Sequence, residues 1–149
     1  MGEQKGRRSV LVVQHQRLVR EAFVSLLTGL RDFDVREAAT EDEGVRMSRE
    51  LQPDIVLIDT GVAGSRQHLF ISRIKRALPP DGRVLVIAED ADQANLESAL
   101  AAGASAYTSK DICFEELRHT LRLLTEPEAE DAQLRQTGNP ARTASAIRS

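Results

Sequence analysis

Short, unbroken apolar runs recur along the sequence and are separated by segments with a helical repeat. The runs are SVLVV at 9–13, DIVLID at 54–59, RVLVIA at 83–88 and the weaker SAYTS at 105–109. A further segment, FDVREAA at 33–39, is amphipathic enough to lie at the edge of a sheet. Apolar runs of this kind are typical of parallel strands that are covered on both faces. The pattern therefore predicts a parallel sheet buried between helices.

The segments between the runs predict amphipathic helices. The first helix carries one apolar stripe, followed by the stop signal Gly29, and the stripe consists of Leu18, Val19, Ala22, Phe23, Leu26 and Leu27. Thr40 and Glu43 form a capping box that begins a second helix, which ends near Leu51 before Pro53. Apolar spacings predict three more helices over 70–78, 96–100 and 117–124, the fourth of them stopped by Gly103.

Strand and helix thus alternate five times. Right-handed crossovers then predict a doubly wound α/β fold with helices on both faces of the sheet. We expect an N-terminal extension over 1–8, one domain over 9–124, and a flexible linker or tail over 125–149, where large apolar residues are scarce. In such sheets the functional groups lie beyond the carboxyl ends of the strands.

The amino-acid composition of the chain argues against several classes of function. The 20 basic and 23 acidic residues are mixed along the chain, so no basic stripe predicts direct binding of nucleic acid. The single cysteine, Cys113, excludes an internal disulfide and favours the cytoplasm; an inert thiol is the expected interpretation. We find no targeting signal and no apolar run of about 18 residues that could span a membrane. The loop TGVAGS at 60–65 lacks the ending of a P-loop.

Five segments together resemble the CheY-like receiver domains of bacterial two-component response regulators, in the branch that carries a C-terminal helix-turn-helix of the LuxR type. The matching segments are HQRLVREAFVSLL, ELQPDIVLID, RVLVIAED, AAGASAYTSKD and FEELRHTL, in the expected order and spacing over residues 8–124. The resemblance implies a flavodoxin-like (βα)5 fold with strand order 2-1-3-4-5. It also implies a signalling domain rather than an enzyme.

The resemblance assigns roles to three strand-end residues. Asp59 matches the aspartate that accepts a phosphoryl group, Lys110 matches the lysine that pairs with that group, and Tyr107 matches the aromatic residue that reports the change. Other positions depart from the family pattern. The acid pair that holds Mg²⁺ is replaced by Gln14 and His15, and the hydroxyl residue is replaced by Ala88, which Glu89 follows.

These departures have a physical consequence for the site. Asp59 and Lys110 sum to zero charge when His15 is neutral, which leaves little to attract a hard divalent cation. An amide oxygen and an imidazole are poor ligands for magnesium, so Mg²⁺ binding should be lost or weak and no cofactor is expected. Without the ion, the charge on a transferring phosphoryl group is not stabilised. We therefore predict an Asp59–Lys110 ion pair in an atypical, degenerate receiver, a pseudo-receiver.

Such a domain would act through protein contacts. The expected partner is a second copy or another regulator protein, bound through the fourth helix, fifth strand and fifth helix, or else through the first and fifth helices. The first of these faces carries Glu97, Tyr107, Arg118 and Arg122. DNA would be reached only through a downstream helix-turn-helix, which these residues do not contain.

Two alternatives remain open for the same fold. The first is a working phosphoacceptor, modified on Asp59 by a histidine kinase, in which Glu89 or Asp90 supplies the missing ligand. The second is a small-molecule sensor that binds its ligand in the cleft at the strand ends. A Zn²⁺ or pH-sensing role for His15 with Asp59 and Glu89 is less favoured than a plain polar residue that fills the vacated position.

Overall fold

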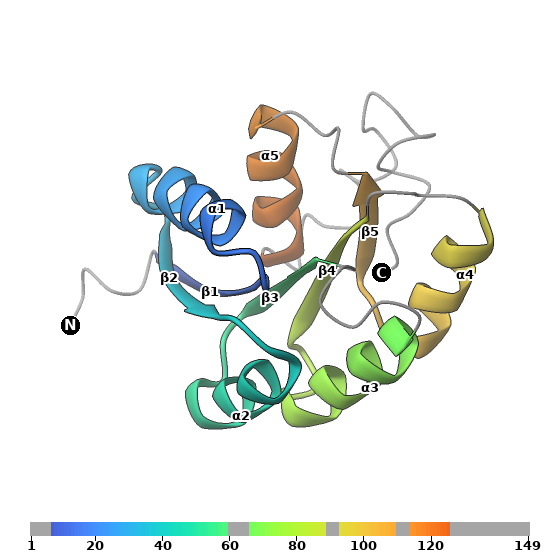
Figure 1. The fold of residues 1–149 in the computed structure, drawn as a ribbon. Coiled ribbons are helices and arrows are strands. Elements are labelled where there is room, and N and C mark those ends of the chain that lie inside the picture. Colours follow the sequence, from blue (N-terminus) through green and yellow to red (C-terminus); the bar gives the residue numbers. More distant parts are fainter. Residues whose placement is uncertain (1–6, 60–65, 89–92, 110–113, 126–149) are drawn as a thin grey trace.

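The computed structural model describes residues 7–59, 66–88, 93–109 and 114–125. Within these ranges strands and helices alternate along the whole chain (Figure 1). The strands are β1 Arg8–Val13, β2 Phe33–Ala38, β3 Ile55–Asp59, β4 Arg83–Ala88 and β5 Ala106–Ser109. The helices are α1 Arg17–Gly29, α2 Glu41–Leu51, α3 Gln67–Ala77, α4 Gln93–Ala102 and α5 Phe114–Thr125. Each predicted strand and helix is found within a few residues of its expected place.

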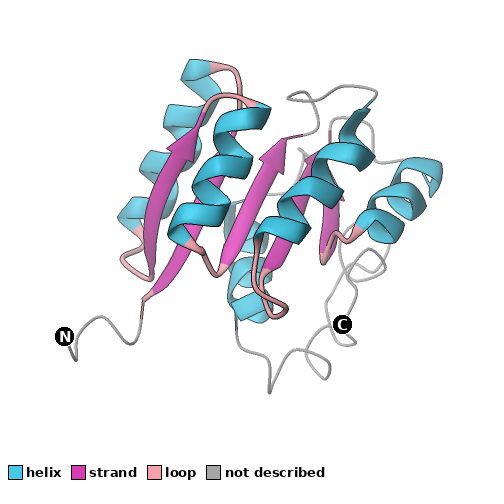
Figure 2. Cartoon of the chain, turned by 90° about the horizontal axis from the view of Figure 1, so that it is seen from below, coloured by secondary structure: helices cyan, strands magenta, loops and turns pink. Residues whose placement is uncertain are grey.

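The strands form one parallel sheet in the order β2-β1-β3-β4-β5. The central pairs are continuous: β1 lies beside β3 from Val10 opposite Ile55, and β3 lies beside β4 from Ile55 opposite Arg83. The view in Figure 2, from the side of α2 and α3, shows the strand arrows running in one direction. The predicted flavodoxin-like α/β fold and its strand order are therefore confirmed, and the amphipathic strand 33–38 lies at an edge.

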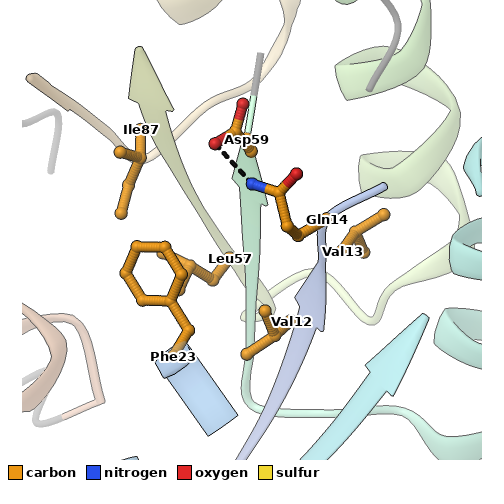
Figure 3. Close-up of a pocket in the computed structure, with 7 residues that line it drawn as sticks. All are labelled: Val12, Val13, Gln14, Phe23, Leu57, Asp59 and Ile87. Carbon is orange, nitrogen blue, oxygen red and sulfur yellow. Dashed lines mark hydrogen bonds between the residues drawn. The ribbon is translucent and has the colours of Figure 1, made fainter. Parts of the chain in front are cut away.

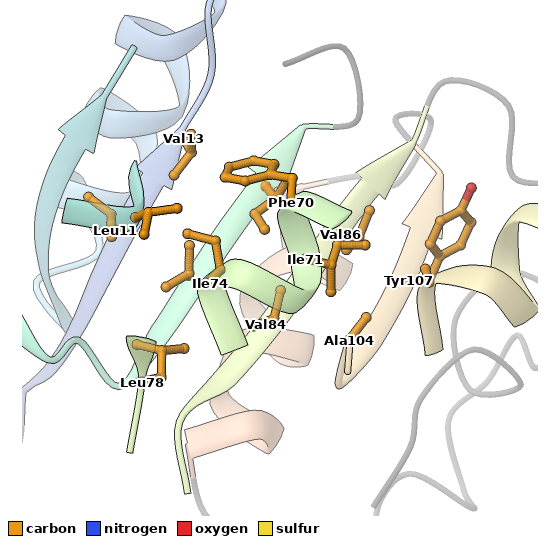
Figure 4. Close-up of a cluster of buried hydrophobic side chains, with 14 of the residues drawn as sticks. Leu11, Val13, Phe70, Ile71, Ile74, Leu78, Val84, Val86, Ala104 and Tyr107 are labelled. Atoms are coloured by element: carbon orange, nitrogen blue, oxygen red, sulfur yellow. The ribbon is translucent and has the colours of Figure 1, made fainter. Parts of the chain in front are cut away.

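Buried side chains form two clusters, one on each face of the sheet. On one face, alternate strand residues such as Val12, Leu57 and Ile87 pack against Leu27 of α1 and Leu121 of α5. On the other face, the remaining strand residues pack against α2, α3 and α4, and Figure 4 shows Phe70, Ile71 and Ile74 of α3 at the centre of that cluster. Since strand side chains alternate between faces, this arrangement explains why the apolar runs are unbroken.

The apolar stripe predicted for the first helix is buried only along one edge. Leu27 is fully buried and Phe23 packs against the sheet, but Leu18 is 80% exposed and Leu26 is 47% exposed. Ala22, which lies one turn from each of these leucines, is exposed as well. The stripe is wider than the contact with the sheet, so its outer edge faces solvent.

The helix ends depend on local chemistry that the sequence largely reveals. Thr40 Oγ1 accepts a hydrogen bond from the backbone N–H of Glu43 at 3.1 Å, which confirms the capping box at the start of α2. Gly103 follows α4 with φ of 120°, a conformation that favours glycine. The stop predicted at Gly29 is confirmed in position, since Gly29 is the last residue of α1, but the left-handed conformation occurs two residues later, at Arg31.

Several predictions fall partly or wholly outside the described residues. The segment 1–6 and the segment 126–149 lie there, so the proposed extension, tail and domain boundaries stay predictions. In the part of the chain that the structure describes, no helix is long and apolar enough to cross a membrane.

Candidate functional site

Polar side chains follow the central strands at one edge of the sheet. Gln14 comes directly after β1, and Asp59 is the last residue of β3, the strand beside it. Both side chains are buried, with 1% and 4% of their surfaces exposed. Figure 3 shows the two groups pointing toward each other above the apolar residues of the strands. The structure thus brings together two of the residues that the sequence placed at this site.

A short hydrogen bond joins these two side chains. Gln14 Nε2 donates to Asp59 Oδ2 at 2.6 Å, and Gln14 Oε1 accepts from the backbone N–H of Gln16 at 2.9 Å. Only this orientation of the amide sets each donor against an acceptor, since the reverse would place two oxygens together at Asp59. A hydrogen bond to an ionised, buried acceptor is stronger than a neutral one. The amide of Gln14 is therefore a fixed partner of the carboxylate.

The backbone of Gln14 also forms two hydrogen bonds. Its N–H donates to the carbonyl oxygen of Ala38 on β2 at 3.1 Å, and its carbonyl oxygen accepts from Arg20 Nη1 at 3.0 Å. Arg20 is itself oriented by Glu37, whose Oε1 accepts from Arg20 Nε at 2.8 Å. The sequence did not indicate these roles for Gln16 and Arg20, because they depend on how the start of α1 lies over the strand ends.

The space beside this pair is small. A cavity of about 10 Å³ lies between Gln14, Asp59 and the apolar side chains of Val12, Phe23, Leu57 and Ile87 (Figure 3). That volume holds at most about one water molecule. This cavity is therefore too small for a metabolite-sized ligand.

The donor set at this site does not suit Mg²⁺. Magnesium takes several oxygen ligands, usually including carboxylates. Here Oδ2 of Asp59 faces the Gln14 amide, and Oε1 of Gln14 faces a backbone N–H. In the described ranges, no three His, Cys, Asp or Glu side chains gather as a possible metal site. Among the described residues, this pair supplies only one carboxylate, which does not fit the ion that the family resemblance implies.

The other predicted residues within the described ranges have simpler positions. His15 is exposed, while Ala88 is buried at the end of β4. Tyr107 on β5 is only 2% exposed and packs in the same cluster as Ala88 (Figure 4).

Further predicted residues lie outside the described ranges. These are Lys110, Glu89, Asp90, Cys113 and the loop 60–65. The predicted ion pair between Asp59 and Lys110 and the alternative ligands Glu89 and Asp90 consequently stay predictions.

Two arginines of α5 contact the segment that precedes β2. Arg118 and Arg122 both form ion pairs with Asp32, which precedes β2. The hydrogen bond from Arg122 lowers the pKa of the Asp32 carboxyl from its ordinary value, with burial opposing it and the positive charges adding to it. Glu97 on α4 is exposed. Two of the four residues predicted on the face of α4, β5 and α5 thus pair with the segment that precedes β2.

The chain belongs to the family of response regulator receiver domains. The model of that family matches residues 10–122, which include β1 through most of α5. Receiver domains are signalling modules of two-component systems, and the match covers both residues of the Gln14–Asp59 pair.

Curated relatives of the chain include transcriptional regulatory proteins. It is 33% identical over 114 residues to the transcriptional regulatory protein YhcZ of Bacillus subtilis, covering 74% of this chain and 52% of that protein. It is 34% identical over 104 residues to LnrK of the same organism, covering 69% and 47%. The chain spans about half the length of the curated relatives it matches.

Solved structures agree with this assignment. A LuxR-family two-component response regulator from Aurantimonas sp. SI85-9A1 is 25% identical with a TM-score of 0.74, covering 88% of this chain and 99% of that one. The receiver domain of the response regulator NarL from Mycobacterium tuberculosis is 24% identical with a TM-score of 0.71, covering 80% and 98%. The latter likeness shows the fold alone.

Proposed function

We propose that this chain is an atypical receiver domain whose signalling does not depend on phosphorylation of Asp59. The hydrogen bond of 2.6 Å between Gln14 Nε2 and Asp59 Oδ2 is the observation that supports this proposal. The amide occupies one oxygen of the carboxylate that would attack a phosphoryl donor. It also stands where the family pattern expects an acidic ligand of Mg²⁺.

Electrostatics also disfavours phosphoryl transfer to Asp59. Phosphoryl transfer depends on cations that neutralise charge on the transferring oxygens. An amide that donates a hydrogen bond stabilises the carboxylate in its resting form but supplies no positive charge to a transition state. Displacing it would also leave both ends of the amide without their present partners, and unpaired buried polar groups cost about 1–3 kcal/mol each.

Acetyl phosphate with Mg²⁺, read by intact mass, tests the proposal. We expect no mass increase by a phosphoryl group in the wild-type chain. The triple variant Gln14→Asp, His15→Asp and Ala88→Thr should gain Mg²⁺ binding and the mass increase, because it restores two carboxylates and the hydroxyl. Stoichiometric phosphorylation of the wild type on Asp59 would overturn the proposal and favour the alternative of a kinase-driven phosphoacceptor.

We propose further that the domain acts by pairing with a second copy through α1 and α5. On α1, Leu18 and Leu26 lie two turns apart with Ala22 between them, and all three are exposed. On α5, Arg118 and Arg122 form ion pairs with Asp32, in the segment that joins α1 to β2. A two-fold axis would place the apolar strips of two copies against each other with charged groups at the rim. Burial of Tyr107 weakens the competing face at β5.

Light scattering after size exclusion tests this pairing. The wild-type chain should be a dimer, and the variant Leu18→Glu with Leu26→Glu should be a monomer. Leu69→Glu is the matched control, because Leu69 is 51% exposed on α3, on the opposite face of the sheet. A monomeric wild type, or a variant that stays dimeric, would contradict the proposal.

We propose that the pairing serves transcription regulation. The relatives YhcZ and LnrK are transcriptional regulatory proteins about twice the length of the matching region. A DNA-binding domain that is joined to this chain, or carried by a partner regulator, would be brought together by the dimer. Binding of promoter DNA by the Leu18→Glu, Leu26→Glu form of the whole regulator should be weaker than that of the wild type. Unchanged binding would contradict this role.

A further inference from the structure

A basic cleft lies between α2 and α3, on the face of the sheet opposite α1. The two helices lie side by side (Figure 1), and the cleft between them has a volume of about 400 Å³. Its walls carry Arg46 and Arg49 from α2 and Arg73 and Arg76 from α3. This volume falls in the range of small-molecule sites, about 300–1,000 Å³.

Charge in the cleft is unbalanced. Besides the four arginines, the lining contains the buried Val45 and one acidic residue, Asp42. Arg73 is anchored by Glu41 at 3.1 Å and by Asp42 at 3.3 Å. Arg46 forms an exposed pair with Glu50 at 3.4 Å, a kind of contact that contributes little. The acidic residues thus position Arg46 and Arg73 but do not pair with all four arginines of the cleft.

Two of the four arginines have no acidic partner within the described part of the chain. Arg49 forms no side-chain hydrogen bond or ion pair there, and Arg76 donates only to the hydroxyl of Ser72 at 3.3 Å. The two residues stand on opposite walls of the cleft. Guanidinium groups facing each other across a groove repel, and their planar fork suits phosphate oxygens. An anion between them would remove this repulsion.

We infer that the α2–α3 cleft binds a small anion that carries two or three linked phosphate groups. Arg49 and Arg76 come from different helices and have no acidic partner among the described residues, so a ligand that reaches both needs an anionic group for each wall. Linked phosphates supply one group for each wall of a cleft of about 400 Å³, whereas a single phosphate monoester supplies only one. The size of the cleft and its two arginine walls suit the same class of ligand.

The surroundings of the cleft disfavour a nucleic acid strand. Glu41, Asp42 and Glu43 begin α2, and Glu50 lies near its end, so negative charge flanks the basic region on α2. An extended polyanion would pass all of these carboxylates, while a compact ligand in the cleft would meet only Asp42 among the lining residues. The whole chain also has a net charge of −3. The inference concerns a site remote from Asp59, so it stands or falls independently of the proposal on phosphorylation.

Thermal unfolding of the full chain with sodium pyrophosphate tests the site. Ligands that bind only the folded state raise Tm with concentration, so we expect a saturable rise of several degrees. Inorganic phosphate at the same ionic strength should give a smaller rise, and a short single-stranded oligonucleotide none. No rise with pyrophosphate, or a larger effect of phosphate or of the oligonucleotide, would overturn the inference.

A pair of charge-matched variants makes the test specific. Arg49→Gln with Arg76→Gln should abolish the rise, because it removes the two arginines that lack acidic partners. Arg17→Gln with Arg36→Gln removes the same charge from exposed positions on α1 and β2 and should keep it. Isothermal titration with pyrophosphate gives the same comparison without heating, with at least a tenfold weaker affinity expected for the first variant. Equal responses of the two variants would contradict the site.

Discussion

Replacing Gln14 by glutamate tests the buried pair with a change of one atom in the side chain. In Gln14→Glu, the donor that lies 2.6 Å from Asp59 Oδ2 becomes an oxygen. The hydrogen bond to a charged group is lost, which costs about 1.5–3 kcal/mol. Two carboxylates whose charges lie about 4 Å apart add about 4 kcal/mol of repulsion at an effective dielectric constant near 20.

The sum, about 6 kcal/mol, exceeds the roughly 3.7 kcal/mol that protonating a glutamate of ordinary pKa costs at pH 7. We therefore expect Gln14→Glu to lower the free energy of unfolding by about 4 kcal/mol at neutral pH, a large share of the usual 5–15 kcal/mol. Urea unfolding followed by circular dichroism measures the change. Millimolar MgCl₂ should recover part of the loss, since two adjacent carboxylates attract a hard divalent cation. NaCl at equal ionic strength should recover much less, because buried charges are screened weakly.

Gln16→Glu is the matched control for this experiment. It makes the same chemical change two residues away, at an exposed position before α1. It should alter stability by less than about 0.5 kcal/mol, as is usual for surface substitutions. If Gln14→Glu were as stable as this control, the reasoning about a buried amide–carboxylate pair would be refuted.

Substitutions at four other positions test the account of the fold. Thr40→Ala should cost about 1 kcal/mol through loss of the α2 cap, and Thr40→Ser should restore most of it in urea unfolding. Gly29→Ala should stabilise by up to about 1 kcal/mol because its added methyl meets nothing within 4 Å, whereas Gly44→Ala should gain less or lose stability because its methyl would lie 3.1 Å from a β1 valine. Arg122→Gln should remove stability that the lowered pKa of Asp32 provides above about pH 3.8, so its deficit should shrink as the pH falls below that value.

The fold could be predicted because its strands and helix starts are encoded by residues that lie close together in the sequence. The unbroken runs marked the strands, and Thr40 with Glu43 marked the start of α2. The exposure of Leu18 and Leu26 could not be predicted in this way. A helical stripe shows which residues are apolar, but only the packed sheet decides how much of the stripe it covers.

The sequence predicted that Gln14 and Asp59 lie together at the strand ends, but it did not predict which atoms they contact. Parallel strands bring their carboxyl ends to one edge, so Gln14 and Asp59 were expected to meet there. The direction of the Gln14 amide depends on the backbone N–H of Gln16. The hydrogen bond from Arg20 to the carbonyl oxygen of Gln14 depends on where α1 begins. The α2–α3 cleft was not foreseen, because its arginines come from two helices that lie apart in the sequence.

Beryllofluoride with Mg²⁺, a mimic of the phosphoryl group, gives the most direct measurement of whether Asp59 has kept its family role. Backbone amide spectra of the wild-type chain should stay unchanged around Asp59 and Tyr107, because Gln14 occupies the carboxylate and the described side chains offer no ligand set for magnesium. Large, saturable shifts of both amides would contradict this interpretation and show that Asp59 still accepts a phosphoryl group.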